Sequence, residues 1–158
     1  MAPYMQLHDA KSRPANTEKA RQRIVRGISL LEEVVRINPG NWSAYWIMGK
    51  GYQALGNSAS ACDAFGKSFA IQKEEPDIVR ELMFECLNLG RAVEGVQAAE
   101  YAVKLSPEDT GLLANLALAY LIAGKNDDAL LLADKSLQIT PVDTITQNLK
   151  KCIIEVRD

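Results

Sequence analysis

Three glycines recur along the chain at one spacing, and this regularity constrains the fold more than any other feature. Gly56, Gly90 and Gly124 are separated by 34 residues each. A fixed period of this length is typical of repeat proteins, in which each repeat is one supersecondary unit that stacks on the next. A period of about 34 residues fits two antiparallel helices with their connecting turns. The spacing therefore predicts an all-α stack of helix pairs.

Side chains around the glycines repeat with the same period and differ in size from place to place. Small residues at fixed places let paired helices approach closely, while large residues fill the space between the helices. Proline ends a helix, because its ring cannot continue the hydrogen-bonded turn. The large series are Tyr45, Val79 and Leu113, and Met48, Leu82 and Leu116. The small series are Ala61, Gly95 and Ala129, and Ser68, Ala102 and Ser136. Pro107 and Pro141 end the second helices of the last two units.

This pattern resembles the tetratricopeptide-repeat (TPR) family over roughly residues 42 to 141. It departs from the family in the middle unit, where the bulky Met83 replaces a small residue, and at Lys73, where the family has proline. The resemblance implies an all-α fold, an α-α superhelix of three helix-turn-helix repeats with an extra N-terminal helix and a C-terminal capping helix. It places the repeats at about 42–75, 76–109 and 110–141.

The helices are expected in pairs, with one of the three glycines inside each pair. A glycine after the first helix suits a left-handed C-cap, which closes the turn into the second helix. Asn57, Asp109 and Asn126 are the expected N-caps. The expected pairs are 42–55 with 58–71, 76–89 with 92–105, and 110–123 with 126–139.

The two ends of the chain depart from the repeat pattern, as terminal repeats commonly do. Residues 1–16 are expected to form a flexible tail, and residues 17–158 a single TPR domain. Within this domain, 17–38 is predicted to be a lone helix with an apolar stripe, and 142–157 a helix that caps the last repeat. The first stripe comprises Ile24, Val25, Ile28, Leu31, Val34 and Val35, and the last comprises Ile145, Leu149, Cys152, Ile153 and Val156.

Composition and charge exclude several classes of function. The net charge of −2 lacks the basic excess of nucleic-acid-binding proteins. No apolar run approaches the roughly 20 residues that a membrane helix needs, and residues 1–11 lack the apolar core of a secretory signal. Three cysteines, all within predicted helices, argue against a disulfide framework and fit buried, reduced thiols. We therefore expect a cytoplasmic protein that binds neither nucleic acid nor membrane.

The residues that catalysis or metal binding would need do not converge. His8 is the single histidine, so neither a catalytic triad nor a multi-histidine metal site is expected. Gly66 to Ser68 resemble the end of a phosphate-binding loop, but Ala61 stands where that motif needs its first glycine. Cys86 fits core packing rather than a nucleophile. We expect no catalysis, no cofactor and no metal.

The resemblance implies that the first helix of each repeat lines a concave groove in which a partner protein binds. Trp46 and Phe84 would be aromatic anchors for an apolar peptide, since aromatic residues are common binding hot spots. Lys50, Arg80 and Asn88 would donate hydrogen bonds to a peptide backbone or to a carboxylate. The expected partner-binding residues are Trp46, Lys50, Gln53, Arg80, Phe84, Asn88, Ala114 and Leu118.

Two further expectations concern what occupies this groove. In the third repeat, the final helix is an alternative occupant of the aliphatic stretch of Leu118, Leu121 and Ile122. Some TPR proteins hold an acidic chaperone tail through a two-carboxylate clamp, and we expect no such binding here. That clamp would need a lysine, two asparagines, a lysine and an arginine where this chain has Trp46, Lys50, Glu81, Gly111 and Asn115.

The leading function is an adaptor that holds a peptide or a helix of another protein in the concave groove. One alternative is a small TPR chaperone for secreted proteins, similar to the type III secretion class. Because such chaperones often dimerise through N-terminal helices, a homodimer through the lone helix 17–38 is a further expectation, with coverage by residues 3–7 as its alternative. Another alternative is an accessory or regulatory subunit that contacts an enzyme through its convex face.

Overall fold

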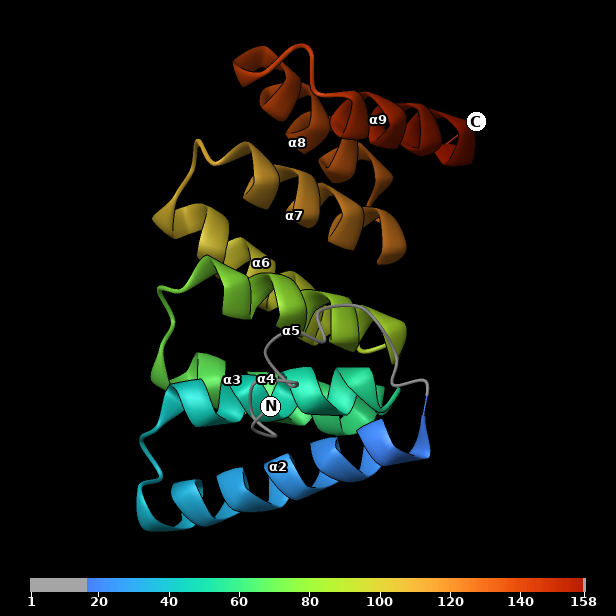
Figure 1. Cartoon of the computed structure of the whole chain (residues 1–158). Coiled ribbons are helices and arrows are strands. Elements are labelled where there is room, and N and C mark those ends of the chain that lie inside the picture. Colours follow the sequence, from blue (N-terminus) through green and yellow to red (C-terminus); the bar gives the residue numbers. More distant parts are fainter. Residues whose placement is uncertain (1–16, 158) are drawn as a thin grey trace. The chain divides into compact units, whose positions relative to one another are not determined.

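The chain folds into helices joined by short turns (Figure 1). The computed structural model describes residues 17–157, so the predicted tail 1–16, with residues 3–7 and His8, lies outside the described residues. Each helix begins and ends within two residues of its expected bounds, which confirms the all-α repeat assignment. Among the described residues, no helix combines the length and the apolar character that crossing a membrane requires. The helices are α2 (Glu18–Ile37), α3 (Trp42–Ala54), α4 (Ser58–Ile71), α5 (Pro76–Asn88), α6 (Ala92–Leu105), α7 (Thr110–Ile122), α8 (Asn126–Ile139) and α9 (Thr144–Arg157).

The described residues divide into two compact units. The first extends to Glu85 and the second begins at Cys86, so the boundary falls inside α5. The first unit contains α2, α3, α4 and most of α5, and the second contains the end of α5 and α6 to α9. The expectation of a single domain over 17–158 stays a prediction.

The same turn follows each of α3, α5 and α7. Gly56 and Gly90 have φ of +75° and Gly124 has φ of +81°, a left-handed conformation that glycine adopts freely and that costs other residues roughly 1–2 kcal/mol. The backbone N–H after each glycine donates to the carbonyl five residues earlier, which is the bond of a Schellman C-cap. The predicted role of the glycines is confirmed. The three bonds join Asn57 to Tyr52 (2.9 Å), Arg91 to Cys86 (2.8 Å) and Lys125 to Tyr120 (2.8 Å).

Two of the three predicted N-caps are confirmed. The side chains of Asn57 and Asp109 each accept a hydrogen bond of 3.1 Å from a backbone N–H in the first turn of α4 and of α7. The third prediction, Asn126, is wrong, because Asn126 is the first residue of α8 and Lys125 occupies the N-cap. Lys125 makes no side-chain capping bond there. The backbone conformation of the turn at Gly124 therefore sets where α8 begins.

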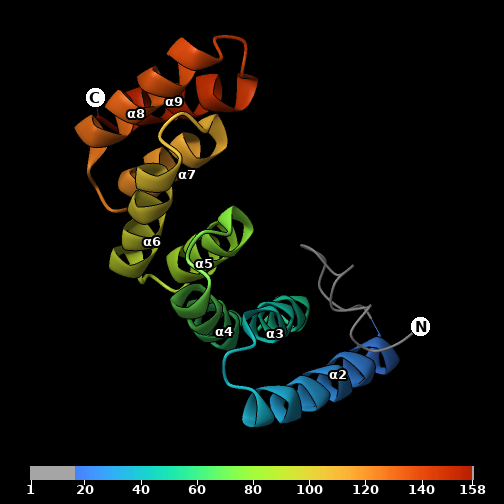
Figure 2. The same ribbon diagram turned by 90° about the vertical axis from the view of Figure 1, so that its left-hand side faces the viewer.

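In the first unit, α2 packs on α3 and α3 packs on α4 (Figures 1 and 2). Gly49 of α3 faces the buried ring of Phe65 of α4, which lets these two helices approach closely. Ser68 of α4 is fully buried and donates a hydrogen bond to the backbone carbonyl of Trp42 at the start of α3 (2.9 Å). The small residues at repeated places therefore serve the close packing that the sequence pattern predicts.

α2 buries a narrower face than its sequence predicts. Val25 and Val34 belong to the predicted apolar stripe, yet both are exposed. The reason is that α2 is covered by α3 on one side, and a single neighbouring helix buries a strip narrower than the apolar face. The residues of the stripe that join the core are Ile24, Ile28, Leu31 and Val35.

In the second unit, consecutive helices from α6 to α9 contact one another, and α9 also contacts α7 (Figures 1 and 2). Ser136 of α8 is fully buried and donates to the backbone carbonyl of Thr110 at the start of α7 (3.4 Å). This bond repeats the one from Ser68 to Trp42 in the first unit, and each spans 26 residues of sequence. A shared position in the repeat thus makes the same tertiary bond in both units.

α9 packs on the second unit with only part of its predicted stripe, namely the buried Ile153 and Leu149, which packs against the same core cluster. Ile145, Cys152 and Val156 of the predicted stripe are exposed, whereas Thr146 and Ile153 are buried. Thr146 tolerates burial because its hydroxyl donates to Oδ2 of Asp143 (2.5 Å). Two ion pairs also join α9 to α8, Lys150 with Asp134 (2.7 Å) and Arg157 with Asp127 (3.3 Å).

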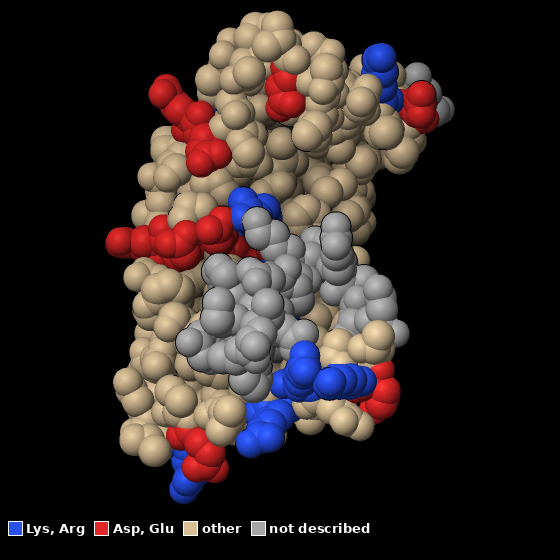
Figure 3. Space-filling view, in the orientation of Figure 1, with Lys and Arg blue, Asp and Glu red and all other residues tan. Residues whose placement is uncertain are grey.

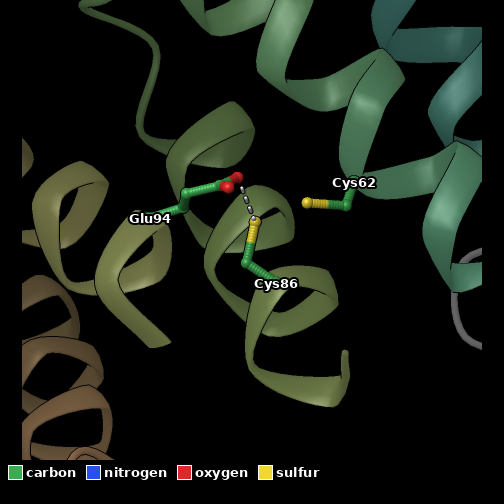
Figure 4. A group of neighbouring side chains, drawn as sticks. All are labelled: Cys62, Cys86 and Glu94. Atoms are coloured by element: carbon green, nitrogen blue, oxygen red, sulfur yellow. Dashed lines mark hydrogen bonds between the residues drawn. The ribbon is translucent and has the colours of Figure 1, made fainter. Parts of the chain in front are cut away.

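Two of the three cysteines are buried, as predicted. Cys62 lies in α4 of the first unit. Cys86, at the start of the second unit, is fully buried, and its Sγ lies 3.9 Å from Oε2 of Glu94 on α6, a weak S–H···O hydrogen bond (Figure 4). The prediction is wrong for Cys152, which is exposed, because α8 covers another side of α9.

Candidate partner-binding surface

A polar network joins α3 to α5 within the first unit, on two of the helices expected to bind a partner. Lys50 Nζ donates to Oε1 of Glu81 (3.1 Å). Gln53 Nε2 donates both to Oε2 of Glu81 (2.6 Å) and to Oε1 of Glu85 (3.0 Å). Lys50 and Gln53 are three positions apart on α3, and Glu81 and Glu85 are four apart on α5, so each pair shares one face of its helix.

This network is largely buried and carries more negative than positive formal charge. Lys50 is 3% exposed and Glu85 is 6% exposed, while the side chain of Glu81 is 19% exposed. Two carboxyl groups face one ammonium group. Buried charge is costly unless it is paired and hydrogen-bonded, so the composition of this network favours an added positive charge. Figure 3 shows a separate row of acidic side chains at the surface, which reaches the left edge of the molecule about halfway up.

Two aromatic side chains flank the network. Trp46 is half-buried and lies one helical turn before Lys50, whose Nζ is 5.9 Å from the centroid of the Trp46 ring, within cation–π range. Phe84 lies three positions after Glu81 on α5, a spacing that makes the two residues neighbours on the helix surface, and it is 39% exposed. An exposed ring beside a fixed polar network offers a partner both apolar contact area and hydrogen-bonding groups. We call the surface of Trp46, Lys50, Gln53, Arg80, Glu81, Phe84 and Glu85 the α3–α5 face.

The cationic side chains expected to bind a peptide are already engaged. Lys50 is buried and bonded to Glu81, so it supports the network rather than standing as an exposed donor. Arg80 is exposed and forms an ion pair with Asp77 on its own helix. The structure therefore brings Trp46, Lys50 and Gln53 together and leaves Arg80 at the surface.

The remaining expected residues belong to the second unit. Asn88 is exposed at the end of α5, and Ala114 and Leu118 are half-buried on α7. Leu121 packs against the core cluster that α8 and α9 share, whereas Ile122 is exposed. The alternative that the final helix covers this aliphatic stretch stays a prediction, as does the part of Ala114 and Leu118 in binding.

Glu81 and Glu85 are the network members that the sequence does not assign to the site. From the sequence, Glu81 counts only as one of the residues that depart from the two-carboxylate clamp, and Glu85 carries no expected role. The available signal is that both are acidic and lie one turn apart on a first helix. Their partners, Lys50 and Gln53, lie 28 to 32 residues earlier, and only tertiary packing reveals that pairing.

Comparison with known proteins identifies the fold by structure. No family model matches the chain, and no curated protein matches it by sequence. Its structure is similar to that of MamA, with a TM-score of 0.75 and 18% identity over 98% of this chain and 80% of MamA. It is similar to YrrB, described as a TPR protein with an unusual peptide-binding site, with a TM-score of 0.73 and 17% identity over 86% and 70% of the two chains. It is also similar to the first TPR domain of Spaghetti (RPAP3) bound to the HSP90 peptide SRMEEVD, with a TM-score of 0.65 and 16% identity over 73% and 92% of the two chains.

The chain therefore has the TPR fold, with helices packed in adjacent pairs. This fold is typically a protein–protein interaction module and is generally non-catalytic. The similar structures include TPR domains that bind peptides. At identities of 16–18% they show the fold alone, so the ligands of those proteins are not transferred to this one.

Proposed function

We propose that the chain is a protein-binding adaptor without catalytic activity, which holds a peptide or a helix of a partner protein on the α3–α5 face. The observation that carries the proposal is the exposed ring of Phe84 beside the connected network of Lys50, Gln53, Glu81 and Glu85. Binding hot spots commonly combine an aromatic anchor with such polar groups. The peptide-binding TPR domains among the similar structures support the general role.

The face is organised before a partner arrives. The four network side chains hold one another through hydrogen bonds of 2.6–3.1 Å between two helices. Because these groups are already ordered, binding loses less side-chain entropy than binding to a mobile surface would. A partner segment that covers Phe84 also removes apolar surface from water, which contributes about 25 cal/mol per Å².

Peptide selection by phage display on the immobilised chain tests the proposal. The dissociation constants of selected peptides are measured by calorimetry for the native chain and for the Arg80→Ala/Phe84→Ala variant. Both side chains are exposed, so the variant should keep the native circular dichroism spectrum. We expect its affinity to fall at least about tenfold, because truncating an aromatic anchor usually costs more than 1.4 kcal/mol.

A matched control removes exposed apolar surface elsewhere. Val93 on α6 and Leu131 on α8 are 70% and 69% exposed, and the Val93→Ala/Leu131→Ala variant should bind as the native chain does. The proposal is wrong if selected peptides bind the Arg80→Ala/Phe84→Ala variant as tightly as the native chain. Affinity capture from the source cells then compares the native chain with the Arg80→Ala/Phe84→Ala variant. If the chain is instead an accessory subunit that binds through its convex face, both should capture the same proteins.

We also propose self-association through α2. Leu30, Val34 and Ile37 are exposed and lie at spacings of four and three, which place them on one face of the helix. A second copy of α2 would cover this apolar face. Light scattering at two protein concentrations should show a dimer that the Leu30→Glu variant disrupts, and a strict monomer at both concentrations would remove the proposal.

A further inference from the structure

Resting on the proposed function, we propose that the α3–α5 face recognises a basic residue of its partner, and specifically an arginine. The guanidinium group binds to the acidic network through Gln53, Glu81 and Glu85. The proposed function names only a peptide or helix as partner, and this inference adds the chemistry by which that partner is recognised.

The network contains two acceptors that lack a donor among the described residues. Nε2 of Gln53 donates to both Glu81 and Glu85, yet Oε1 of Gln53 and Oε2 of Glu85 are buried without a hydrogen-bond partner. Glu85 as a whole is 6% exposed. A buried acceptor without a partner destabilises the folded state, more so when it is charged. The two atoms therefore indicate a missing donor.

The charge of the network indicates whether the missing donor group is neutral or charged. Lys50 is the one cation among the four network residues and is bonded to Glu81, so this network holds one carboxyl group more than it holds ammonium groups. An added carboxylate would be repelled, whereas an added cation would be attracted. This is the reverse of the ligand charge that Lys50 and Arg80 suggest from the sequence alone.

The geometry of the acceptors favours arginine over lysine. A guanidinium group presents five N–H donors in a planar fork, so one group can donate to Oε2 of Glu85 and to Oε1 of Gln53 together. A lysine ammonium is a compact point charge without this fork. Charge-assisted bonds of the bidentate kind are also the stronger ones.

The network meets the surface where such a side chain can reach it. The side chain of Glu81 is 19% exposed, and Phe84, three positions later on the same helix, is 39% exposed. Oε2 of Glu85 is buried, so binding requires this carboxylate to turn about its last torsion, which is broad, and to exchange its bond from Gln53 for bonds from the guanidinium group. The stem of the arginine then packs along the Phe84 ring, and its guanidinium plane suits stacking on an aromatic face.

The experiment replaces arginine by citrulline, which keeps the shape of the side chain and removes its charge, in the peptides selected on the native chain. We expect selected peptides to contain arginine and the citrulline forms to bind about 10- to 100-fold more weakly, the range for losing a charge-assisted hydrogen-bonded group. The isosteric Glu85→Gln variant should lose a similar factor. On the Glu85→Gln variant, the citrulline peptide should bind no more weakly than the arginine peptide, because both changes remove the same interaction.

A charge control and a direct titration complete the test. Glu33 is exposed on α2 of the same unit, and Glu33→Gln removes an equal charge, so it should change affinity by less than about twofold.

If peptides depend on Phe84 but citrulline changes affinity by less than about twofold, the inference is overturned and the adaptor proposal stands. If no peptide is selected, the adaptor proposal fails, and NMR titration of the native chain with N-acetylarginine amide decides the inference. Shifts of the Gln53 side-chain amide with this probe and not with its citrulline analogue support the inference, and their absence overturns it.

Discussion

Gly49 of α3 lies directly against the ring of Phe65 of α4. A β-carbon added to Gly49 would be 2.5, 2.6 and 2.7 Å from Cε1, Cδ1 and Cζ of that ring. Carbon atoms in van der Waals contact are about 3.5–4.0 Å apart, and Phe65 is fully buried, so no side chain fits at Gly49 unless the ring moves. This pair sets how closely α3 and α4 approach, and it thereby positions the helix that carries Lys50.

The first prediction concerns this contact. Gly49→Ala should lower the free energy of unfolding by about 1–3 kcal/mol, the usual cost of overpacking a core. Gly66→Ala is the matched control, because the nearest atom to an added β-carbon there, Cδ1 of Leu82, is 4.0 Å away. It should raise stability by up to about 1 kcal/mol through helix propensity. Urea unfolding of both variants checks the pair, and equal effects would contradict the steric argument.

The second prediction isolates backbone conformation. Gly56 has φ of +75° and an added β-carbon would meet no atom within 4 Å, so Gly56→Ala should destabilise through strain alone, by roughly 1–2 kcal/mol. Gly56→Asn should cost less, since asparagine tolerates the left-handed conformation better. Thermal unfolding of both variants checks this order. If Gly56→Asn is no more stable than Gly56→Ala, the left-handed conformation does not cause the loss of stability.

The third prediction concerns the pair of Lys50 and Glu81. Lys50→Met should destabilise by about 3 kcal/mol, because it leaves carboxyl groups without their cation in a largely buried network. Adding Glu81→Gln to this variant should restore part of the loss, since one of the two acidic groups is then removed. Urea unfolding of the single and double variants gives the coupling energy, and additive losses would mean that the two side chains act independently.

The fourth prediction concerns alkaline pH. Burial raises the pKa of Tyr120 above 10.0, with further contributions from Glu100, as a charge and as hydrogen-bond acceptor, and from Asp128. The folded state thus holds this proton more tightly than the unfolded state does, so the stabilisation is fully present below pH 10 and is lost as pH rises through the folded pKa. Tyr120→Phe should reduce this loss. Ultraviolet titration should show a lower pKa of Tyr120 in Glu100→Gln, and an unchanged pKa would contradict the assigned cause.

The fifth prediction uses the three thiols. Cys62 and Cys86 are buried and Cys152 is exposed, so a thiol reagent should label one cysteine rapidly in the native protein and all three after unfolding. Reagents reach an exposed thiol without an opening of the structure. In Cys152→Ser the rapid phase should disappear. A rapid phase that persists in this variant would place another thiol at the surface.

The sequence predicts the helix boundaries closely because each boundary coincides with a local signal. Gly56 supplies the only backbone conformation that closes its turn cheaply, and Asn57 supplies the cap of the next helix. The prediction fails at Asn126, where the position of the glycine and the type of the capping residue disagree. The residue directly after Gly124 takes the N-cap position, and that residue is Lys125 rather than Asn126. Spacing alone cannot rank these signals.

The candidate site is less predictable because its key contacts are not local. Lys50 can be buried because it pairs with Glu81, 31 residues later in the sequence. The repeat pattern does not indicate which residues of two neighbouring first helices contact each other. The covered face of a terminal helix is equally non-local. Ile145 is apolar but exposed, and Thr146 is polar but buried, since the position of α8 decides which side of α9 is covered.

In the first unit α2 contacts α3 and α3 contacts α4, and in the second unit consecutive helices from α6 to α9 contact one another. Bringing such neighbours together closes only short segments of chain, for which the entropic cost is small. Chains dominated by local contacts also fold faster than those that must join distant segments. A chain built in this way can acquire structure during its own synthesis, because each new helix emerges from the ribosome next to the helix on which it packs.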